Sequence, residues 1–258
     1  MVARRRFCGI AVMAKASAPG RTKTRLVPPL TYEEAAGLNT AFLKDVAANL
    51  AAARAAGAPV ASYMAYGPPG TEDFFLDALP HDVGLIETWR PGFGECLFHA
   101  VRALFDRGHE AACVLNADSP TLPTGLLVDL AARLARPGDR AVLGPAEDGG
   151  YWVLGLKAPH RRLFEAIDWS TERVAAQTLA RAAEIGLPVE ILPTWYDVDD
   201  RASLHRLVAE VLHGETPDPD APPLHPAPAT AAFLRDAFAR TDLAARLDDA
   251  RLPQREVA

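Results

Sequence analysis

The chain has 258 residues, of which 49% are hydrophobic and 23% charged, and its formal net charge is −6. This length and composition are typical of one large α/β domain, or of a domain of about 200 residues with an appendage. The acidic balance argues against general nucleic-acid binding, and no apolar run approaches the ~20 residues that a membrane span requires.

Short β-rich runs alternate with amphipathic stretches through the first 214 residues. Strands are predicted at 8–14, 60–66, 83–89, 111–117, 140–146, 151–156 and 189–195. Several of these runs are almost continuously apolar, as in parallel strands that are buried on both faces. Helices are predicted between them at 31–57, 94–107, 124–136, 170–185 and 201–213. The alternation predicts the α/β class, with a single Rossmann-like, doubly wound and mostly parallel sheet.

The chain after residue 214 departs from this pattern. Residues 215–229 are rich in proline, which predicts an extended linker. The following stretch, 230–247, has the pattern of one amphipathic helix. We therefore expect a domain at 1–214, a Pro-rich linker at 215–229 and a C-terminal helical extension at 230–258. This extension is expected to pack back on the domain or to support a homo-oligomer.

The N-terminal segment and the cysteines give information on the cellular compartment of the protein. The start of the chain is basic, but the apolar run after it is too short for a signal-peptide core. Three cysteines are scattered without a C-x-x-C pair, so neither a disulfide framework nor a zinc knuckle is indicated. We expect a cytoplasmic protein that has neither nucleic acid nor a membrane as a partner.

A cationic loop directly follows the first predicted strand. The stretch AKASAPGRTKTRL contains no acid, and its Pro-Gly pair predicts a turn at Gly20. It is not a Walker P-loop, because Thr22 stands where that motif requires glycine. Lysine offers phosphate a point charge and arginine a two-pronged donor, so the loop predicts a phosphate site. The alternative is a solvated basic loop. The cations are Lys15, Arg21, Lys23 and Arg25.

Two acidic stretches follow later strands. In LNADSPTLP, a predicted strand delivers Asp118 to its carboxyl end, where a carboxylate suits Mg²⁺ (or Mn²⁺) bridging to substrate phosphates. The alternative role for Asp118 is a turn or a helix cap. In TWYDVDD, Asp197 and Asp199 alternate, so an extended chain points them to opposite faces and only one is expected to join Asp118. Asp200 is expected to cap the next helix.

The stretch GPAEDGGYWVLGL places two acids and two glycines before a strand. Glu147 and Asp148 precede Gly149 and Gly150. Paired glycines let backbone N–H groups approach a ligand closely, or simply make a tight hairpin turn. The adjacent acids and aromatics favour a substrate site. Trp169 stands at a predicted helix start, where it is either structural or faces the substrate.

In combination, these stretches resemble a known family. The chain contains five motifs in this order: K-x-x-x-P-G-x-x-K-T-R-L, D-x-P, G-P-x-E-D-G-G-Y, W-S-T and D-V-D. Together they are similar to the motifs of the rSAM/selenodomain-associated transferase 1 family. That family resembles the 2-phospholactate guanylyltransferases, within the nucleotide-diphospho-sugar transferase (GT-A) fold superfamily. The resemblance covers about residues 8 to 205 and implies a GT-A-type domain at 1–214.

The resemblance also implies roles for individual residues. It implies a divalent metal, Mg²⁺ or Mn²⁺, on Asp118 and Asp199. The stretch 90–100 keeps Gly94 and Glu95 but lacks an arginine of the family's pattern. The residues expected to act in catalysis are Lys23, Asp118 and Asp148. Those expected on the nucleotide phosphates are Lys15, Gly20, Arg21, Lys23 and Arg25. Those expected beside the second substrate are Gly94, Glu95, Glu147, Gly149, Gly150 and Trp169.

The leading hypothesis for function is Mg²⁺-dependent nucleotidyl transfer from a nucleoside triphosphate to a small phosphorylated acceptor, with release of pyrophosphate. The alternative is glycosyl transfer from a nucleotide-diphosphate sugar, with Glu147 or Asp148 as a base for the acceptor hydroxyl. The absence of a D-x-D at Asp118 favours the first. A third hypothesis is a non-catalytic nucleotide-binding scaffold that recruits partners through its C-terminal helix.

Overall fold

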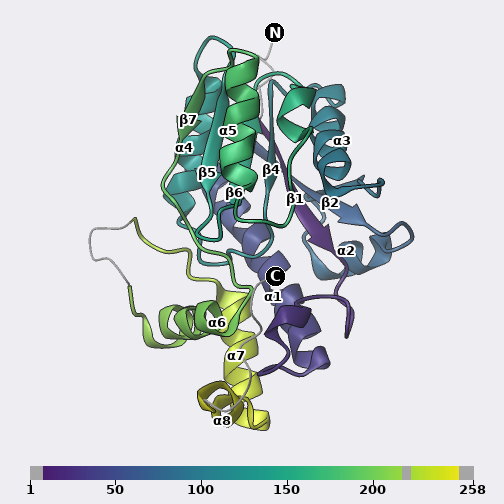
Figure 1. Ribbon diagram of the computed structural model, residues 1–258. Helices are drawn as coiled ribbons and strands as arrows, with labels where there is room; N and C mark the ends of the chain where they lie inside the picture. The colour runs from purple at the N-terminus through teal and green to yellow at the C-terminus, as the bar shows by residue number, and fades with distance from the viewer. Residues whose placement is uncertain (1–7, 217–221, 250–258) are drawn as a thin grey trace.

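The computed structural model describes residues 8–216 and 222–249, and shows one seven-stranded sheet with helices on both faces (Figure 1). Residues 217–221 of the predicted linker, and 250–258 of the predicted extension, lie outside the described residues. The strand order is β3-β2-β1-β4-β6-β5-β7. The strands are β1 (Cys8–Lys15), β2 (Val60–Gly67), β3 (Gly84–Glu87), β4 (Ala111–Leu115), β5 (Ala141–Pro145), β6 (Tyr151–Leu156) and β7 (Val189–Ile191).

Strand β6 is the one strand of this sheet that runs against the others. It pairs antiparallel with both β4 and β5, whereas β1, β2, β3 and β4 are parallel neighbours and β5 is parallel to β7. Because its direction is reversed, β6 begins at the edge where the parallel strands end. The predicted doubly wound, mostly parallel α/β sheet is confirmed.

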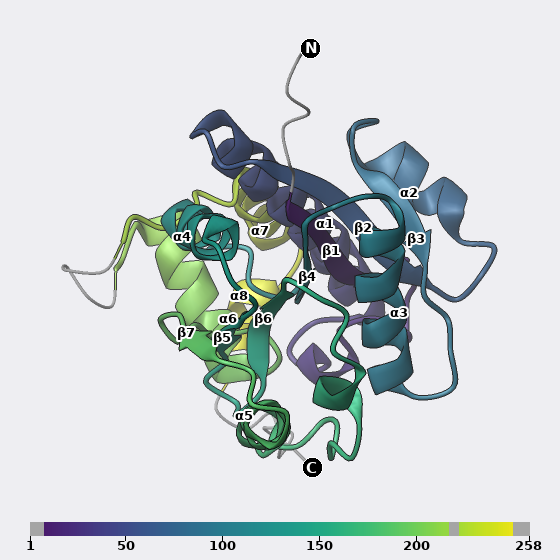
Figure 2. The same ribbon diagram turned by 90° about the horizontal axis from the view of Figure 1, so that it is seen from above.

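Helices α1 and α4 lie on one face of the sheet and α3 and α5 on the other (Figure 2), and two clusters of buried apolar side chains fill the space between the layers. One is formed largely with α1, α4, α6 and α7, and the other with α3 and α5. The helices are α1 (Tyr32–Ala55), α2 (Glu72–Ala78), α3 (Phe93–Asp106), α4 (Thr124–Ala135), α5 (Val174–Glu184), α6 (Arg201–Val208), α7 (Pro228–Arg240) and α8 (Leu243–Asp248). Short 3-10 helices lie at Thr24–Leu26 and Arg161–Phe164, and a π-helical turn at Ala209–His213 extends α6. No helix among the described residues has the length and apolar character needed to cross a membrane.

Element boundaries differ from the predictions where backbone chemistry intervenes. Helix α5 begins at Val174 rather than at 170, because Ser170 has φ +66°, which a right-handed helix does not allow. Strand β7 ends at Ile191, shortly before Pro193, which has no N–H for a sheet ladder. The seven-residue helix α2 was not predicted, because it is too short to show a periodic pattern.

The C-terminal helices pack back onto the domain through α1. Asp45 of α1 is 1% exposed, and its two carboxylate oxygens accept hydrogen bonds from Ala229 N (2.9 Å) and Thr230 N (2.7 Å) at the start of α7. A carboxylate there satisfies free helix N–H groups and complements the helix dipole. Asp45 therefore fixes α7 against α1. The two helices lie beside each other in Figure 1.

The single helix predicted at 230–247 is in fact two helices. Thr241 adopts an extended backbone after α7, and its hydroxyl accepts a hydrogen bond from Leu243 N (3.2 Å) at the start of α8. Arg246 of α8 then pairs with Glu34 (2.7 Å), which also completes a capping box with Thr31 at the start of α1. The break lets α8 turn back onto the first turn of α1.

Replacing Asp45 by Ala is expected to lower the free energy of unfolding by about 1–3 kcal/mol, because two buried N–H groups lose their acceptor. Chemical denaturation measures this change, and limited proteolysis measures the release of α7. The control is Asp236→Ala, which removes an exposed carboxylate of α7 and is expected to change stability by less than about 0.5 kcal/mol. Equal stabilities for the two variants would contradict the docking role of Asp45.

Candidate functional site

A cavity of about 390 Å³ opens at the carboxyl edge of the sheet, beside the ends of β1 and β4. The loop after β1, the segment after β4, the start of α3 and Asp199 form its wall. Six predicted site residues line it: Lys15, Arg21, Lys23, Arg25, Asp118 and Asp199. The other lining residues are Met13, Thr22, Thr24, Asn39, Phe93, Leu97, Val114, Leu115, Asn116, Ala117 and Tyr151.

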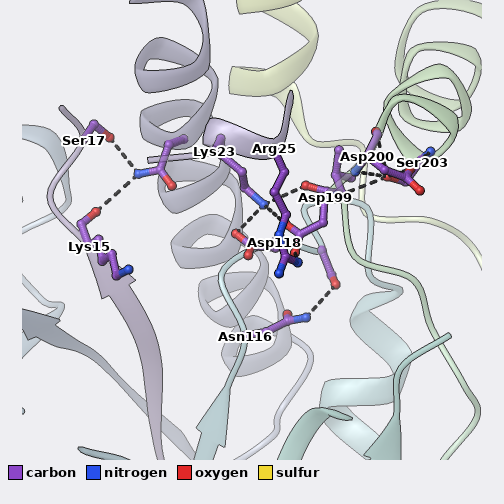
Figure 3. Close-up of polar contacts among 12 residues, drawn as sticks. Lys15, Ser17, Lys23, Arg25, Asn116, Asp118, Asp199, Asp200 and Ser203 are labelled. Carbon is purple, nitrogen blue, oxygen red and sulfur yellow. Dashed lines mark hydrogen bonds and ion pairs between the residues drawn. The ribbon is translucent and has the colours of Figure 1, made fainter. Parts of the chain in front are cut away.

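The ammonium of Lys23 lies at the meeting point of two carboxylates (Figure 3). Its Nζ is 2.9 Å from Asp118 Oδ1, 2.9 Å from Asp199 Oδ1 and 2.7 Å from the carbonyl oxygen of Val198. The side chain is only 4% exposed and passes over the ring of Phe42. Lys23 therefore joins the loop after β1 to the two acidic segments in the interior of the site.

The local fold brings these acidic segments together. The N–H of Val198 donates to the Asp118 carbonyl (2.9 Å), and the Ser119 hydroxyl donates to the Tyr196 carbonyl (2.7 Å). Asp200 caps α6 as predicted, accepting from Ser203 N at 2.7 Å. The segment is thus held on both sides of Asp199, whose carboxylate faces Lys23 and, at 3.5 Å, Arg25.

Charge coupling shifts the pKa values of all three groups. Burial opposes the charged form of Lys23, but the two neighbouring carboxylates outweigh it and raise its pKa. For Asp118, burial and the repulsion of Asp199 outweigh the attraction of Lys23, and its pKa rises. For Asp199, the attraction of Lys23 and Arg25 overcomes burial, and its pKa falls. The site holds its cation firmly, with Asp199 as the more strongly ionised carboxylate.

Asp197 lies on the same acidic segment but forms no ion pair among the residues that the structure describes. Burial raises its pKa to about 7, and the repulsion of Asp199, Asp148 and Asp118 adds to the effect. The alternation of Asp197 and Asp199 thus has the predicted consequence that only Asp199 shares the ammonium with Asp118.

The remaining cations of the loop are open to solvent. Lys15 and Arg21 are exposed, and within residues 8–216 and 222–249 neither side chain forms an ion pair. Gly20 makes the predicted turn with φ +73° but does not line the cavity. Asn39 of α1 fixes the base of the loop, donating to the Lys15 carbonyl (3.3 Å) and to the Ser17 hydroxyl (2.8 Å). The loop therefore presents unpaired positive charge from a fixed base.

An aromatic wall closes the side of the cavity at α3. Phe93 lines the cavity, is 50% exposed, and meets Trp169 edge to face with ring centroids 5.5 Å apart. A Cβ on Gly94 would lie 2.7 Å from both the Phe164 carbonyl and Trp169 Nε1, so this glycine permits the wall to pack. Glu95 points to the outer side of α3 and pairs with Arg161.

The acidic and glycine pairs before β6 lie outside the cavity lining. Glu147 pairs with Arg206 at 3.0 Å, and Asp148 accepts a hydrogen bond from Gly150 N at 2.8 Å within the turn between β5 and β6. Gly149 has φ +87°, and its backbone packs so closely against Glu172 that a side chain has no room. The glycines thus serve the hairpin turn in this structure.

Asn39, Phe93 and Tyr151 are three of the eleven lining residues that were not predicted as site residues. Asn39 had a readable signal, because it is one of three polar residues, with Asp45 and Asn49, on the mainly apolar buried face of α1. The Tyr151 hydroxyl is buried and has no hydrogen-bond partner among the described residues. Phe93 gave no signal, since exposed aromatics are common outside sites. Tyr151 is one of the two aromatics after the glycine pair that favoured a substrate site.

The donor set around Lys23 Nζ suits a magnesium-type ion. Two carboxylate oxygens and one carbonyl oxygen converge on a single point, and hard oxygen ligands are what Mg²⁺ and Mn²⁺ prefer. Among the residues that the structure describes, no group of three or more His, Cys, Asp or Glu side chains forms a metal cluster. An ion here would rely on two carboxylates and on oxygens from substrate or water, as Mg²⁺ commonly does.

The fold and the sequence both have known relatives. Residues 47–171 match the model of a family described as "Uncharacterized protein conserved in bacteria (DUF2064)". A crystal structure from Desulfovibrio desulfuricans G20, described as a "putative nucleotide-diphospho-sugar transferase", is 26% identical with a TM-score of 0.74. The alignment covers 90% of this chain and 95% of that one. No curated protein matches the sequence.

More distant structures share the fold. CMP:2-keto-3-deoxy-manno-octonic acid synthetase complexed with CTP has a TM-score of 0.51 at 12% identity, over 81% of this chain and 100% of that one. A cytidylyltransferase from Leptospira borgpetersenii has a TM-score of 0.52 at 10% identity, over 95% and 98%. The fold is thus that of nucleotidyltransferases and nucleotide-diphospho-sugar transferases, which supports the transferase class for this protein.

Because folding raises the pKa of Asp197 from 3.8 to about 7, the folded state binds this proton more tightly than the unfolded state. The free energy of unfolding is therefore expected to fall as pH rises from about 4 to about 7. Asp197→Asn should stabilise the protein more at pH 8 than at pH 5, by roughly 1–3 kcal/mol after allowance for partial exposure. Denaturant titrations with EDTA at both pH values measure this.

The matched control for this experiment is Asp73→Asn on α2, where an exposed carboxylate is removed. This control is expected to show the same change in stability at pH 5 and pH 8. If Asp197→Asn also gained the same stability at pH 5 and at pH 8, folding would not raise the pKa of Asp197.

Proposed function

We propose that this protein is a metal-dependent nucleotidyltransferase, which transfers a nucleotidyl group from a nucleoside triphosphate to a small phosphorylated acceptor and releases pyrophosphate. The observation that carries the proposal is the arrangement of charge around one cavity. Solvent-facing cations of the loop after β1 lie on one side, and the paired carboxylates Asp118 and Asp199 lie on the other. The motif resemblance to the rSAM/selenodomain-associated transferase 1 family supports the same activity.

The exposed cations would hold the phosphates. Lys15, Arg21 and Arg25 line the cavity, and charge-assisted hydrogen bonds from such groups to phosphate oxygens are short and strong. They would bind the triphosphate in the ground state and stabilise the charge that develops on the leaving pyrophosphate. Asn39 fixes the base of their loop, so this positive charge is arranged before the substrate binds.

The carboxylates Asp118 and Asp199 would hold Mg²⁺. Bound there, the ion would neutralise phosphate charge and align the reacting groups. The acceptor phosphate is already ionised, so no protein base is required for its attack. In agreement, Glu147 and Asp148 do not line the cavity, and Glu147 is engaged by Arg206.

Glycosyl transfer from a nucleotide-diphosphate sugar is the second candidate. The description of the Desulfovibrio structure, at 26% identity over most of both chains, favours it. A hydroxyl acceptor would need a base. The two candidate bases are already bound to other groups near the β5–β6 turn, Glu147 to Arg206 and Asp148 to Gly150 N. We therefore favour nucleotidyl transfer.

Pyrophosphate release separates the two candidates. The full-length protein is incubated with Mg²⁺, each of the four ribonucleoside triphosphates and a panel of small phosphorylated acceptors. We expect acceptor-dependent pyrophosphate release and an increase in Tm with at least one triphosphate. An increase in Tm with nucleotide-diphosphate sugars alone, without pyrophosphate release from any triphosphate, would instead favour glycosyl transfer.

Single substitutions test the two halves of the site. Asp118→Asn is expected to abolish turnover, since it removes one of two charged metal ligands. Arg21→Gln is expected to weaken triphosphate binding about tenfold or more, because a hydrogen bond to a charged group contributes about 1.5–3 kcal/mol. Arg102→Gln, an exposed arginine of α3 outside the cavity, controls for net charge and is expected to bind normally. Isothermal titration with a non-hydrolysable triphosphate measures both.

A further inference from the structure

The ammonium of Lys23 has no donor left for a phosphate. An ammonium carries three N–H donors, and its three acceptors here are Asp118 Oδ1, Asp199 Oδ1 and the Val198 carbonyl. With its side chain only 4% exposed, Lys23 also lies behind the solvent-facing cations of its own loop. In this state of the protein, Lys23 serves the carboxylates and not a nucleotide.

Lys23 is also the cation that makes the pairing of these carboxylates possible. Asp118 and Asp199 both lie within 2.9 Å of the ammonium, so their like charges face one another across a single positive group. Among the described residues, Arg25 pairs with Asp199 at 3.5 Å from a side chain that is 47% exposed, and Lys15 acts on Asp118 without forming an ion pair. Removal of Lys23 would leave two facing carboxylates largely uncompensated, which strongly favours uptake of another cation.

The position of Nζ and the position of a divalent ion exclude each other. The oxygens around Nζ are the hard donors that suit Mg²⁺ or Mn²⁺, and such an ion would be surrounded by them at shorter distances than a lysine. Two cations at one point repel strongly, so the ammonium has to leave before an ion can bind both carboxylates. When a nucleoside triphosphate binds at the mouth of the cavity, its phosphates provide an anion to which the ammonium can move.

We propose that the ammonium of Lys23 occupies the metal position in the free protein. It leaves Asp118 and Asp199 only when nucleotide phosphates bind and accept its hydrogen bonds instead. Metal alone is then a poor ligand of the free protein, and metal and nucleotide bind together. This inference rests on the proposed function in one respect, the assignment of Asp118 and Asp199 as metal ligands. The residue acts as a counter-ion before substrate binds and as a phosphate ligand afterwards.

Binding of Mn²⁺ alone tests the proposal, without turnover. Free Mn²⁺ is followed by electron paramagnetic resonance as it is titrated into the wild-type protein and into Lys23→Met, with no nucleotide present. Lys23→Met is expected to bind Mn²⁺ about tenfold or more tightly than wild type, because the competing ammonium is gone. Asp118→Asn in the Lys23→Met background is expected to lose this gain.

Two further variants serve as controls. Lys44→Met removes an exposed lysine of α1 and changes the net charge equally, so it is expected to bind Mn²⁺ as the wild type does. Lys23→Arg keeps the positive charge and is expected to retain weak Mn²⁺ binding. The thermal unfolding temperature is recorded for every variant with and without Mn²⁺. Lys23→Met should gain stability from Mn²⁺ alone, whereas the wild type should gain only when metal and a triphosphate are added together.

The outcomes separate this inference from the proposed function. Suppose that the wild type binds Mn²⁺ alone as tightly as Lys23→Met does, and that Asp118→Asn abolishes this binding. The assignment of Asp118 as a metal ligand then stands, but Lys23 does not compete with the metal. If neither protein binds Mn²⁺, both the metal assignment and the inference are wrong. The wild-type measurement is decisive even where Lys23→Met fails to fold, because micromolar Mn²⁺ binding by the unaltered protein contradicts the inference directly.

Discussion

The contact on which the site depends is the buried ammonium of Lys23 between Asp118 and Asp199. It joins three segments that are far apart in the chain: the loop after β1, the loop after β4 and the strand-like segment before α6. Two facing carboxylates that are only partly exposed repel each other without a cation between them, and this lysine supplies it. Lys23 reaches the two carboxylates from a backbone in the left-handed conformation, with φ +51°.

Around this contact, the fold buries one cation of the loop after β1 and leaves the others exposed. Lys23 faces inward, whereas Lys15 and Arg21 remain exposed over the cavity. The reversed strand β6 adds Tyr151 to the same edge, and α3 adds the aromatic wall of Phe93. The resulting cavity has a cationic rim, an acidic floor and an aromatic side, a combination suited to a nucleotide whose phosphates and base need different surroundings.

Much of the fold was readable because hydrophobic periodicity is a local property. The seven strands and the five long helices of the domain lie where apolar runs and amphipathic patterns predicted them. The Asp200 cap was also predicted, since a helix cap depends on residues only three positions apart. Boundaries differed where one backbone angle or one proline decided them, as at Ser170 and Pro193.

The sequence by itself determined that cations follow the first strand, that acids follow later strands, and that parallel strands would bring them to one edge. Tertiary structure alone decided which of these charges meet. Lys23, rather than Lys15, reaches the carboxylates; Asp199, rather than Asp197, shares it; and Glu147 turns to Arg206. Composition and spacing place charges on segments, but burial and side-chain direction, which fix the strength of their interaction, arise only when the segments pack together.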